Sequence, residues 1–319
     1  METIPMIRCK FLSSIVFCFI SLASFAQKEV YLFSYFIDNG QDGLHLAYST
    51  DGLKWTALND GKSFLAPAVG KDKLMRDPCI LQGSDGLFHM VWTSGWWDRY
   101  IGYASSKDLI HWSEQRTIPV MEQEPSAKNC WAPELTYDPE TKGYIIFWAT
   151  TIPGRHSEVP DSKGEKGLNH RMYCTKTMDF ITFTPAELFF NPDFSTIDAT
   201  ILHRDSKFYM ILKNENPNPP QKNLRVTVAD HASGPYPLKV SEPITGKYWA
   251  EGPTALEIGE YVYVYFDKYT EHKYGAVRSK DMVNWEDVSG QVAFPQGTRH
   301  GTAFKVSQKI FSQLIRSIK

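Results

Sequence analysis

The stretch Ile101 to Trp112, IGYASSKDLIHW, decides the fold because its pattern recurs along the chain. It reads as a strand of small residues, a polar turn and a closing aromatic residue. The same order occurs at Leu44 to Trp55 (LHLAYSTDGLKW), Arg171 to Phe183 (RMYCTKTMDFITF) and Tyr274 to Trp285 (YGAVRSKDMVNW), and in degenerate form from Leu224 (LRVTVADHASGPY). Self-similarity at a nearly constant spacing indicates a repeat architecture.

A second unit precedes each later copy and leads into an aromatic strand. It reads RDPCIL at 76–81, WAPELT at 131–136, IDATIL at 197–202 and EGPTA at 251–255, and the strands that follow read FHMVWTS, YIIFWATT, FYMILKN and YVYVYFDKY. The step from Trp55 to Trp112 equals the step from Asp77 to Glu134, so the two markers move in register. One period therefore corresponds to one four-stranded propeller blade.

The two ends of the repeat complement each other. Residues 31–55 hold only the later part of a unit, whereas Arg299 to Val306 (RHGTAFKV) holds only its first strand. We therefore predict an all-β fold, a five-bladed β-propeller closed by pairing of N- and C-terminal strands, which hides the edges of an open sheet. No linker divides residues 27–319, which we take as a single domain, and the apolar spacing after Ser307 predicts a short helix packed on a blade.

Residues 1–26 have the pattern of a secretory signal peptide. Arg8 and Lys10 charge its start, 11–22 are apolar, and Ala26 ends a run of small residues before Gln27. The apolar run is too short to span a bilayer, so we expect an exported protein, periplasmic or extracellular, with no membrane insertion of the mature chain.

Composition excludes several classes of function. The chain has 319 residues, 22% of them charged, with a net charge of −2, so neither a nucleic-acid partner nor disorder is expected. Aromatic residues make up 14%, with 21 Gly and 19 Pro as turn formers, which suits many short strands. The mature chain keeps Cys79, Cys130 and Cys174, an odd number that predicts no disulfide framework. The sequence has no phosphate-binding Gly-rich loop and no Gly-x-Ser-x-Gly elbow.

The repeat predicts a site, because the first strands of all blades converge on one mouth of the central channel. Aligning the strand starts brings an acid or a histidine from each of the five blades to that mouth: Asp77, Glu134, Asp198, Glu251 and His300, with Arg76 and Arg299 beside them. Clustered carboxylates raise one another's pKa, as catalysis requires. Inverting cleavage of a glycosidic bond needs one carboxylic acid to protonate the leaving oxygen and one carboxylate to activate water, about 6.5–9.5 Å apart.

Tryptophans next to these motifs are candidate sugar platforms, since aromatic rings stack on the apolar faces of monosaccharides. Trp97 and Trp131 fit either that function or packing between blades. Trp55, Trp112 and Trp285 recur at repeat positions, so we expect them in the core.

In their order on successive blades, the motifs resemble the five-bladed β-propeller enzymes of glycoside hydrolase family 43, over essentially the whole mature chain. These motifs are Arg76-Asp77-Pro78, Trp131-Ala132-Pro133, Ile197-Asp198, Glu251-Gly252-Pro253 and Arg299-His300-Gly301. The chain departs from the family at Glu134, where Asp is common, and at Ala199, where Pro is common.

The resemblance implies a role for each catalytic carboxylate. Asp77 would be the general base, Glu251 the general acid, and Asp198 the residue that tunes and orients the acid. His300 would hold a calcium ion or a water at the channel, and no cofactor would be required. We assign substrate contacts to five further residues: Arg76, Trp97, Trp131, Glu134 and Arg299.

The expected activity is exo removal of α-L-arabinofuranosyl or β-D-xylosyl units from plant polysaccharide by a monomeric enzyme, with the 152–170 insertion as one wall of the site. Three alternatives stay open. One is an exo-β-galactosidase acting on galactan, and another is a retaining fructosidase that uses Asp38 as nucleophile. The third is a non-catalytic propeller that binds glycans.

Overall fold

Five β-sheets hold nearly all of the regular secondary structure in the described residues, which confirms the all-β prediction. The computed structural model describes residues 1–2, 29–156, 167–217 and 219–318. Most of the expected signal peptide and the middle of the 152–170 insertion lie outside these residues. Within the described ranges, no helix is both long and apolar enough to cross a membrane.

Each sheet is one blade, and in blades 1 to 4 the strands follow sequence order outward from the axis. Blade 1 holds β4 (Arg76–Gln82), β5 (Phe88–Thr93), β6 (Ile101–Ser106) and β7 (Arg116–Ile118). Blade 2 holds β8 (Trp131–Asp138), β9 (Gly143–Thr151), β10 (His170–Thr177) and β11 (Glu187–Phe190). Blade 3 holds β12 (Thr196–Arg204), β13 (Lys207–Asn214) and β14 (Asn223–Ala229). Blade 4 holds β15 (Glu251–Ile258), β16 (Tyr261–Lys268), β17 (Lys273–Ser279) and β18 (Glu286–Asp287).

Blade 5 closes the ring as the sequence predicts. It holds β19 (Thr302–Val306), β1 (Val30–Tyr35), β2 (His45–Ser49) and β3 (Thr56–Ala57). The strand β1 pairs antiparallel with β19, from Val30 opposite Val306 to Ser34 opposite Thr302. The innermost strands contact one another in the cyclic order β4, β8, β12, β15, β19 and back to β4. The inner strands thus form a closed circle of five.

The repeated turn explains why the sequence motif recurs. In blade 5 the Ser49 hydroxyl accepts from the N–H of Gly52 at 2.8 Å, and the Asp51 carboxylate accepts from the N–H of Leu53 at 2.7 Å. The same hydroxyl and carboxylate arrangement is formed by Ser106 with Asp108, Thr177 with Asp179, and Ser279 with Asp281. A short polar side chain that bonds the backbone two or three residues on favours a tight turn over a longer strand.

Blade 3 departs from the expected four strands, because among the described residues it has three. The segment in the fourth position makes two backbone bonds to β14, from Ser241 N to Val226 O at 2.8 Å and from Ile244 N to Leu224 O at 2.9 Å. Pro235, Pro237 and Pro243 lie in this segment. Because proline has no N–H to donate, this segment cannot form a regular ladder.

Apolar side chains between neighbouring blades form the core. Trp55 is buried in the cluster between blades 4 and 5, edge-on to Phe33 at 5.5 Å, as predicted. Trp112 and Trp285 are only half-buried and pack at the edge of their clusters, so the expectation that they lie in the core holds only in part.

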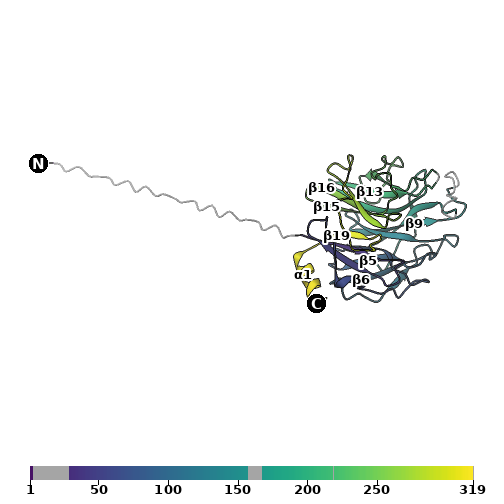
Figure 1. Cartoon of the computed structure of the whole chain (residues 1–319), viewed down its shortest axis with the longest axis horizontal. Helices are drawn as coiled ribbons and strands as arrows, with labels where there is room; N and C mark the ends of the chain where they lie inside the picture. The colour runs from purple at the N-terminus through teal and green to yellow at the C-terminus, as the bar shows by residue number, and fades with distance from the viewer. Residues whose placement is uncertain (3–28, 157–166, 218, 319) are drawn as a thin grey trace.

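The predicted terminal helix is present as α1 (Gln308–Ser317), drawn in yellow at the edge of the molecule (Figure 1). The Ser307 hydroxyl caps it by accepting from the N–H of Ile310. Leu314 is fully buried, and the ring of Phe311 packs 5.0 Å from that of Tyr48 on β2.

Candidate active site

A bulge at the start of four of the five inner strands directs the side chains of the site. The pairing with the second strand shifts between Arg76 and Cys79, Trp131 and Glu134, Ile197 and Thr200, and Glu251 and Thr254. The second residue of each bulge has a left-handed backbone: φ is 51° at Asp77, 46° at Ala132, 51° at Asp198 and 60° at Gly252. Non-glycine residues in this region cost on the order of 1–3 kcal/mol each, and such strain is concentrated at functional sites.

The bulges correct the expected alignment of the carboxylates. Asp77 and Asp198 occupy the same position of their blades, whereas Glu251 lies one position earlier. Glu134 lies two positions later, at the level of Cys79 and Thr200, so its predicted place in the same ring was wrong. The sequence already contains this offset, because superposing the strand starts places Ala132 opposite Asp77 and Glu134 opposite Cys79. Matching Glu134 to Asp77 as one acid to another missed it.

Glu134 closes the channel one layer below the mouth. Its carboxylate accepts from the hydroxyls of Thr200 at 3.2 Å and Thr302 at 3.4 Å and from the Cys79 thiol at 3.5 Å. These donors come from three other inner strands. Burial raises the pKa of Glu134 to about 7 and outweighs the opposing effects of His300 and these donors.

Replacing Glu134 by Gln is expected to stabilise the protein above pH 7. The native pKa lies above the unfolded value, so wild-type stability falls as pH rises from about 4.5 to about 7. The difference between variant and wild type should therefore grow over that window to on the order of 2–3 kcal/mol. Thermal and urea unfolding at pH 4 and pH 8 measure it, with Glu114→Gln on an exposed side chain as control. An equal difference at both pH values would contradict this.

Asp77 is held as a carboxylate. Its Oδ2 accepts from the Thr93 hydroxyl at 2.8 Å, and its Oδ1 lies 3.4 Å from His300 Nδ1. Burial would raise the pKa of Asp77, but His300, Arg76 and Thr93 together outweigh it and lower the pKa to about 2. An ionised carboxylate at a partly open mouth can accept a proton from water.

His300 is a buried cation among acids. Burial opposes its charge, yet Asp77, Asp198 and Glu134 raise its pKa to about 9. A protonated ring has no lone pair for a metal ion, so binding calcium there would first require loss of that proton. Among the described residues, no three His, Cys, Asp or Glu side chains are grouped so as to hold a metal. Calcium at this position stays a prediction.

Asp198 and Glu251 lie close together, and their pKa values are shifted in opposite directions. Asp198 Oδ2 accepts from the N–H of Gly252 at 3.0 Å, next to Glu251 in the chain. Burial and the charge of Glu251 raise the pKa of Asp198 to about 6, against the effect of His300. Burial would also raise the pKa of Glu251, but Lys213 and Arg299 outweigh it and lower the pKa. Their Nζ and Nη2 atoms lie 3.0 and 3.3 Å from the Glu251 carboxylate.

Second-strand residues that sequence reasoning missed complete the site. The residue opposite the start of each inner strand is Thr93, Ala149, Lys213 or Asp267. Three of these reach the next blade: Thr93 bonds the N–H of Ala132, Lys213 bonds Glu251, and Asp267 bonds Arg299. The sequence contained a signal for them. Lys213 and Asp267 are charged residues near the ends of the quoted aromatic strands, and a charged residue is unusual in a buried strand unless it has a partner.

An aromatic wall stands beside the carboxylates. Trp131 lies between Trp96 and Trp97, with ring centroids 5.6 and 5.7 Å away, and Trp97 is 48% exposed. The guanidinium of Arg76 stacks over Trp96 at 4.3 Å. Trp97 also lines a cavity of about 560 Å³ with the described ends of the 152–170 insertion. The structure thus groups Arg76, Trp97 and Trp131, while Arg299 is ion-paired with Asp267 and Glu251.

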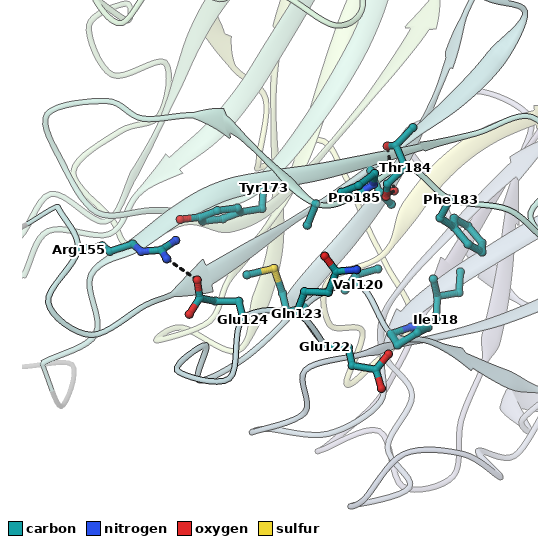
Figure 2. Close-up of a pocket in the computed structure, with 14 residues that line it drawn as sticks. Ile118, Val120, Glu122, Gln123, Glu124, Arg155, Tyr173, Phe183, Thr184 and Pro185 are labelled. Carbon is teal, nitrogen blue, oxygen red and sulfur yellow. Dashed lines mark hydrogen bonds and ion pairs between the residues drawn. The ribbon is translucent and has the colours of Figure 1, made fainter.

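A separate cavity lies on the outer wall of the propeller, away from the carboxylates. Figure 2 shows this cavity, which has a volume of about 460 Å³ and is lined by the end of β7, the segment after it, Arg155, part of β10 and residues 183–186 before β11. An ion pair between Arg155 and Glu124 crosses one side of it. None of the predicted site residues lines it.

Comparisons with known proteins agree with the geometry. The sequence profile of one family, described as a probable glycosyl hydrolase domain related to glycoside hydrolase family 43, matches residues 27–311. The alpha-L-arabinofuranosidase of Bifidobacterium longum subsp. longum is 23% identical over 184 residues, 52% of this chain but only 17% of that protein.

Two solved structures share the fold. The alpha-L-arabinofuranosidase from Lactobacillus brevis matches with a TM-score of 0.51 and 19% identity, over 67% of this chain and 72% of that chain. The exo-beta-1,3-galactanase from Phanerochaete chrysosporium matches with a TM-score of 0.51 and 12% identity, over 67% of this chain and 49% of that chain. At these identities the likeness shows the fold alone.

Proposed function

The chain belongs to the family 43-related glycosyl hydrolases, and from that premise we propose that it is an inverting, exo-acting enzyme that removes α-L-arabinofuranosyl or β-D-xylosyl units from plant polysaccharide. One observation carries the proposal: three carboxylates from three inner strands stand in three different charge environments. Asp77 is held ionised, Asp198 has a raised pKa, and Glu251 is contacted by two cations.

The proposed reaction uses these differences. Asp77 takes a proton from a water molecule, whose oxygen attacks the anomeric carbon as the glycosidic bond breaks. Glu251 gives its proton to the departing oxygen, so the sugar leaves with inverted configuration. Asp198 and Glu251 titrate as one unit, and a proton that the pair holds at mildly acidic pH is available to Glu251. Trp97 and Trp131 present aromatic faces to sugar rings.

The choice of sugar follows the relatives. Arabinofuranosidase is the name of both the curated relative and one structural neighbour, which supports a pentose. The galactanase neighbour supports galactan as the second candidate substrate. We further propose an exported monomer, on the strength of the pattern in residues 1–26, with a calcium ion or a water at His300.

Hydrolysis of a panel of nitrophenyl glycosides, with the anomeric form of the product followed by NMR, tests the proposal. Release of arabinose or xylose with inversion is expected. Galactose would move the assignment to galactan, and fructose released with retention would move the nucleophile to Asp38. If no sugar is released from these donors or from arabinan, xylan and galactan, the remaining hypothesis is a non-catalytic propeller that binds glycans.

A further inference from the structure

A chain of alternating charges passes through the proposed acid. In order, it contains Lys222, Glu215, Lys213, Glu251, Arg299 and Asp267. The first three contacts measure 2.5 Å from Lys222 to Glu215, 2.7 Å from Glu215 to Lys213 and 3.0 Å from Lys213 to Glu251. The last two measure 3.3 Å from Glu251 to Arg299 and 2.5 Å from Arg299 to Asp267. Each group has an opposite charge on every side along the chain.

We propose that Lys213, oriented by Glu215, is a positioning residue that holds the Glu251 carboxylate at the mouth and governs when it takes up a proton. The inference rests on the proposed function only in that Glu251 is taken as the acid. Lys213 itself touches no reacting atom.

The position of Lys213 indicates a function beyond stabilising the fold. Its side chain is 2% exposed, and its Nζ lies between two glutamates from different segments, with the Tyr269 ring 4.7 Å away. Burying a charged network rarely stabilises a fold more than apolar residues of the same size would. The equivalent residue of blade 2 is Ala149, so the propeller does not require a cation at this position.

Other charged groups also face Glu251 and affect its pKa. Asp198 on β12 and Asp267 on β16 oppose its ionisation, whereas Arg299 and His300 before β19 favour it. Tyr269 and Tyr274 are neutral neighbours whose own pKa values are raised by burial. Three groups favour the ionised form of Glu251. Arg299 and His300 belong to the motif before β19, whereas Lys213 lies on the second strand of blade 3 and in none of the site motifs.

Two variants act on the chain in opposite directions. Lys213→Met removes the cation, so the titration midpoint of Glu251 should rise by about one to three pH units. Glu215→Gln removes the acid that shares Lys213, so the midpoint should fall. Lys213→Arg keeps the charge and should keep the wild-type midpoint to within about one unit. Lys207→Met, on an exposed side chain at the far end of β13, is the matched control and should change nothing.

The readout does not depend on activity. Glutamate labelled with ¹³C at the side-chain carboxyl leaves every Asp out of the NMR spectrum, and the Glu251 signal is the one missing from Glu251→Gln. A rise in Lys213→Met together with a fall in Glu215→Gln is the expected result. An unchanged Glu251 midpoint in either variant overturns the proposal. If Lys213→Met does not fold, Glu215→Gln and Lys213→Arg decide it.

Kinetics give a second readout. On a substrate with a poor leaving group, Lys213→Met should lower kcat by about 100-fold while KM changes little, and Lys213→Arg should restore most of the loss. A wild-type enzyme inactive on all glycosides would overturn the proposed function while the titration still tests Lys213. Equal losses in Lys213→Met and Lys213→Arg would assign Lys213 a packing role only.

Discussion

Asp77→Ala is expected to lower kcat/KM by about 10²- to 10⁴-fold, the range of a lost general base. The reason is that the contacts of Asp77 to Thr93 and to protonated His300 keep this carboxylate ionised across the working pH range. The loss should be the same for good and poor leaving groups, because the leaving group takes no part in the proton transfer from water to Asp77. Steady-state kinetics on an arabinofuranoside or xyloside measure it.

Asp205→Ala is the matched control for this change. Asp205 has the same left-handed backbone, with φ of 49°, but stands exposed in the turn between β12 and β13. Both variants therefore carry the same backbone strain for alanine, and only Asp77→Ala should lose activity. Activity within a few-fold of wild type in Asp77→Ala would remove Asp77 from the role of base.

Glu251→Gln should show a loss that depends on the leaving group. With an alkyl or sugar leaving group, kcat is expected to fall by about 10²- to 10⁴-fold, whereas a nitrophenolate departs without a proton and should lose far less. Gln keeps the size of the side chain and an oxygen for Lys213 at the 3.0 Å contact. The comparison of the two substrate types therefore separates proton donation from positioning.

The pH profile adds a second signature to Glu251→Gln. In wild type the proton of the Asp198 and Glu251 pair is lost as pH rises past the raised pKa of Asp198, about 6, so activity should fall on that side. In Glu251→Gln this fall should disappear for activated substrates. If activity falls at high pH in the same way in both enzymes, a group other than Glu251 causes that fall.

The fold was predictable because four of the five blades repeat the same local chemistry. Their turn of Ser or Thr with Asp is visible in the sequence, and it sets the register of these four blades. Asp77 and Asp198 could be predicted as equivalent for the same reason. Glu134 was misplaced because it was matched to Asp77 as an acid, although its position in the motif is that of Cys79, one layer below the mouth. Burial raises its pKa there.

Lys213 and Asp267 escaped prediction for a different reason. They act on the next blade rather than their own, and a strand motif read one blade at a time does not show contacts across blades. The absence of a fourth strand from the described part of blade 3 was also not predicted, because the degenerate copy at Leu224 contains the third strand and the prolines that prevent a fourth come after it.

The pairing of β1 with β19 has a consequence for the order in which the protein can be assembled. During synthesis β1 emerges first and β19 emerges about 270 residues later, so the inner edge of β1, which pairs with β19, has no native neighbour for most of that time. An unpaired, apolar edge is prone to join other chains, and pairing of such distant segments is intrinsically slow. We therefore expect the unpaired edge of β1 to be the part of the growing chain that most needs shielding from other chains until β19 has been made.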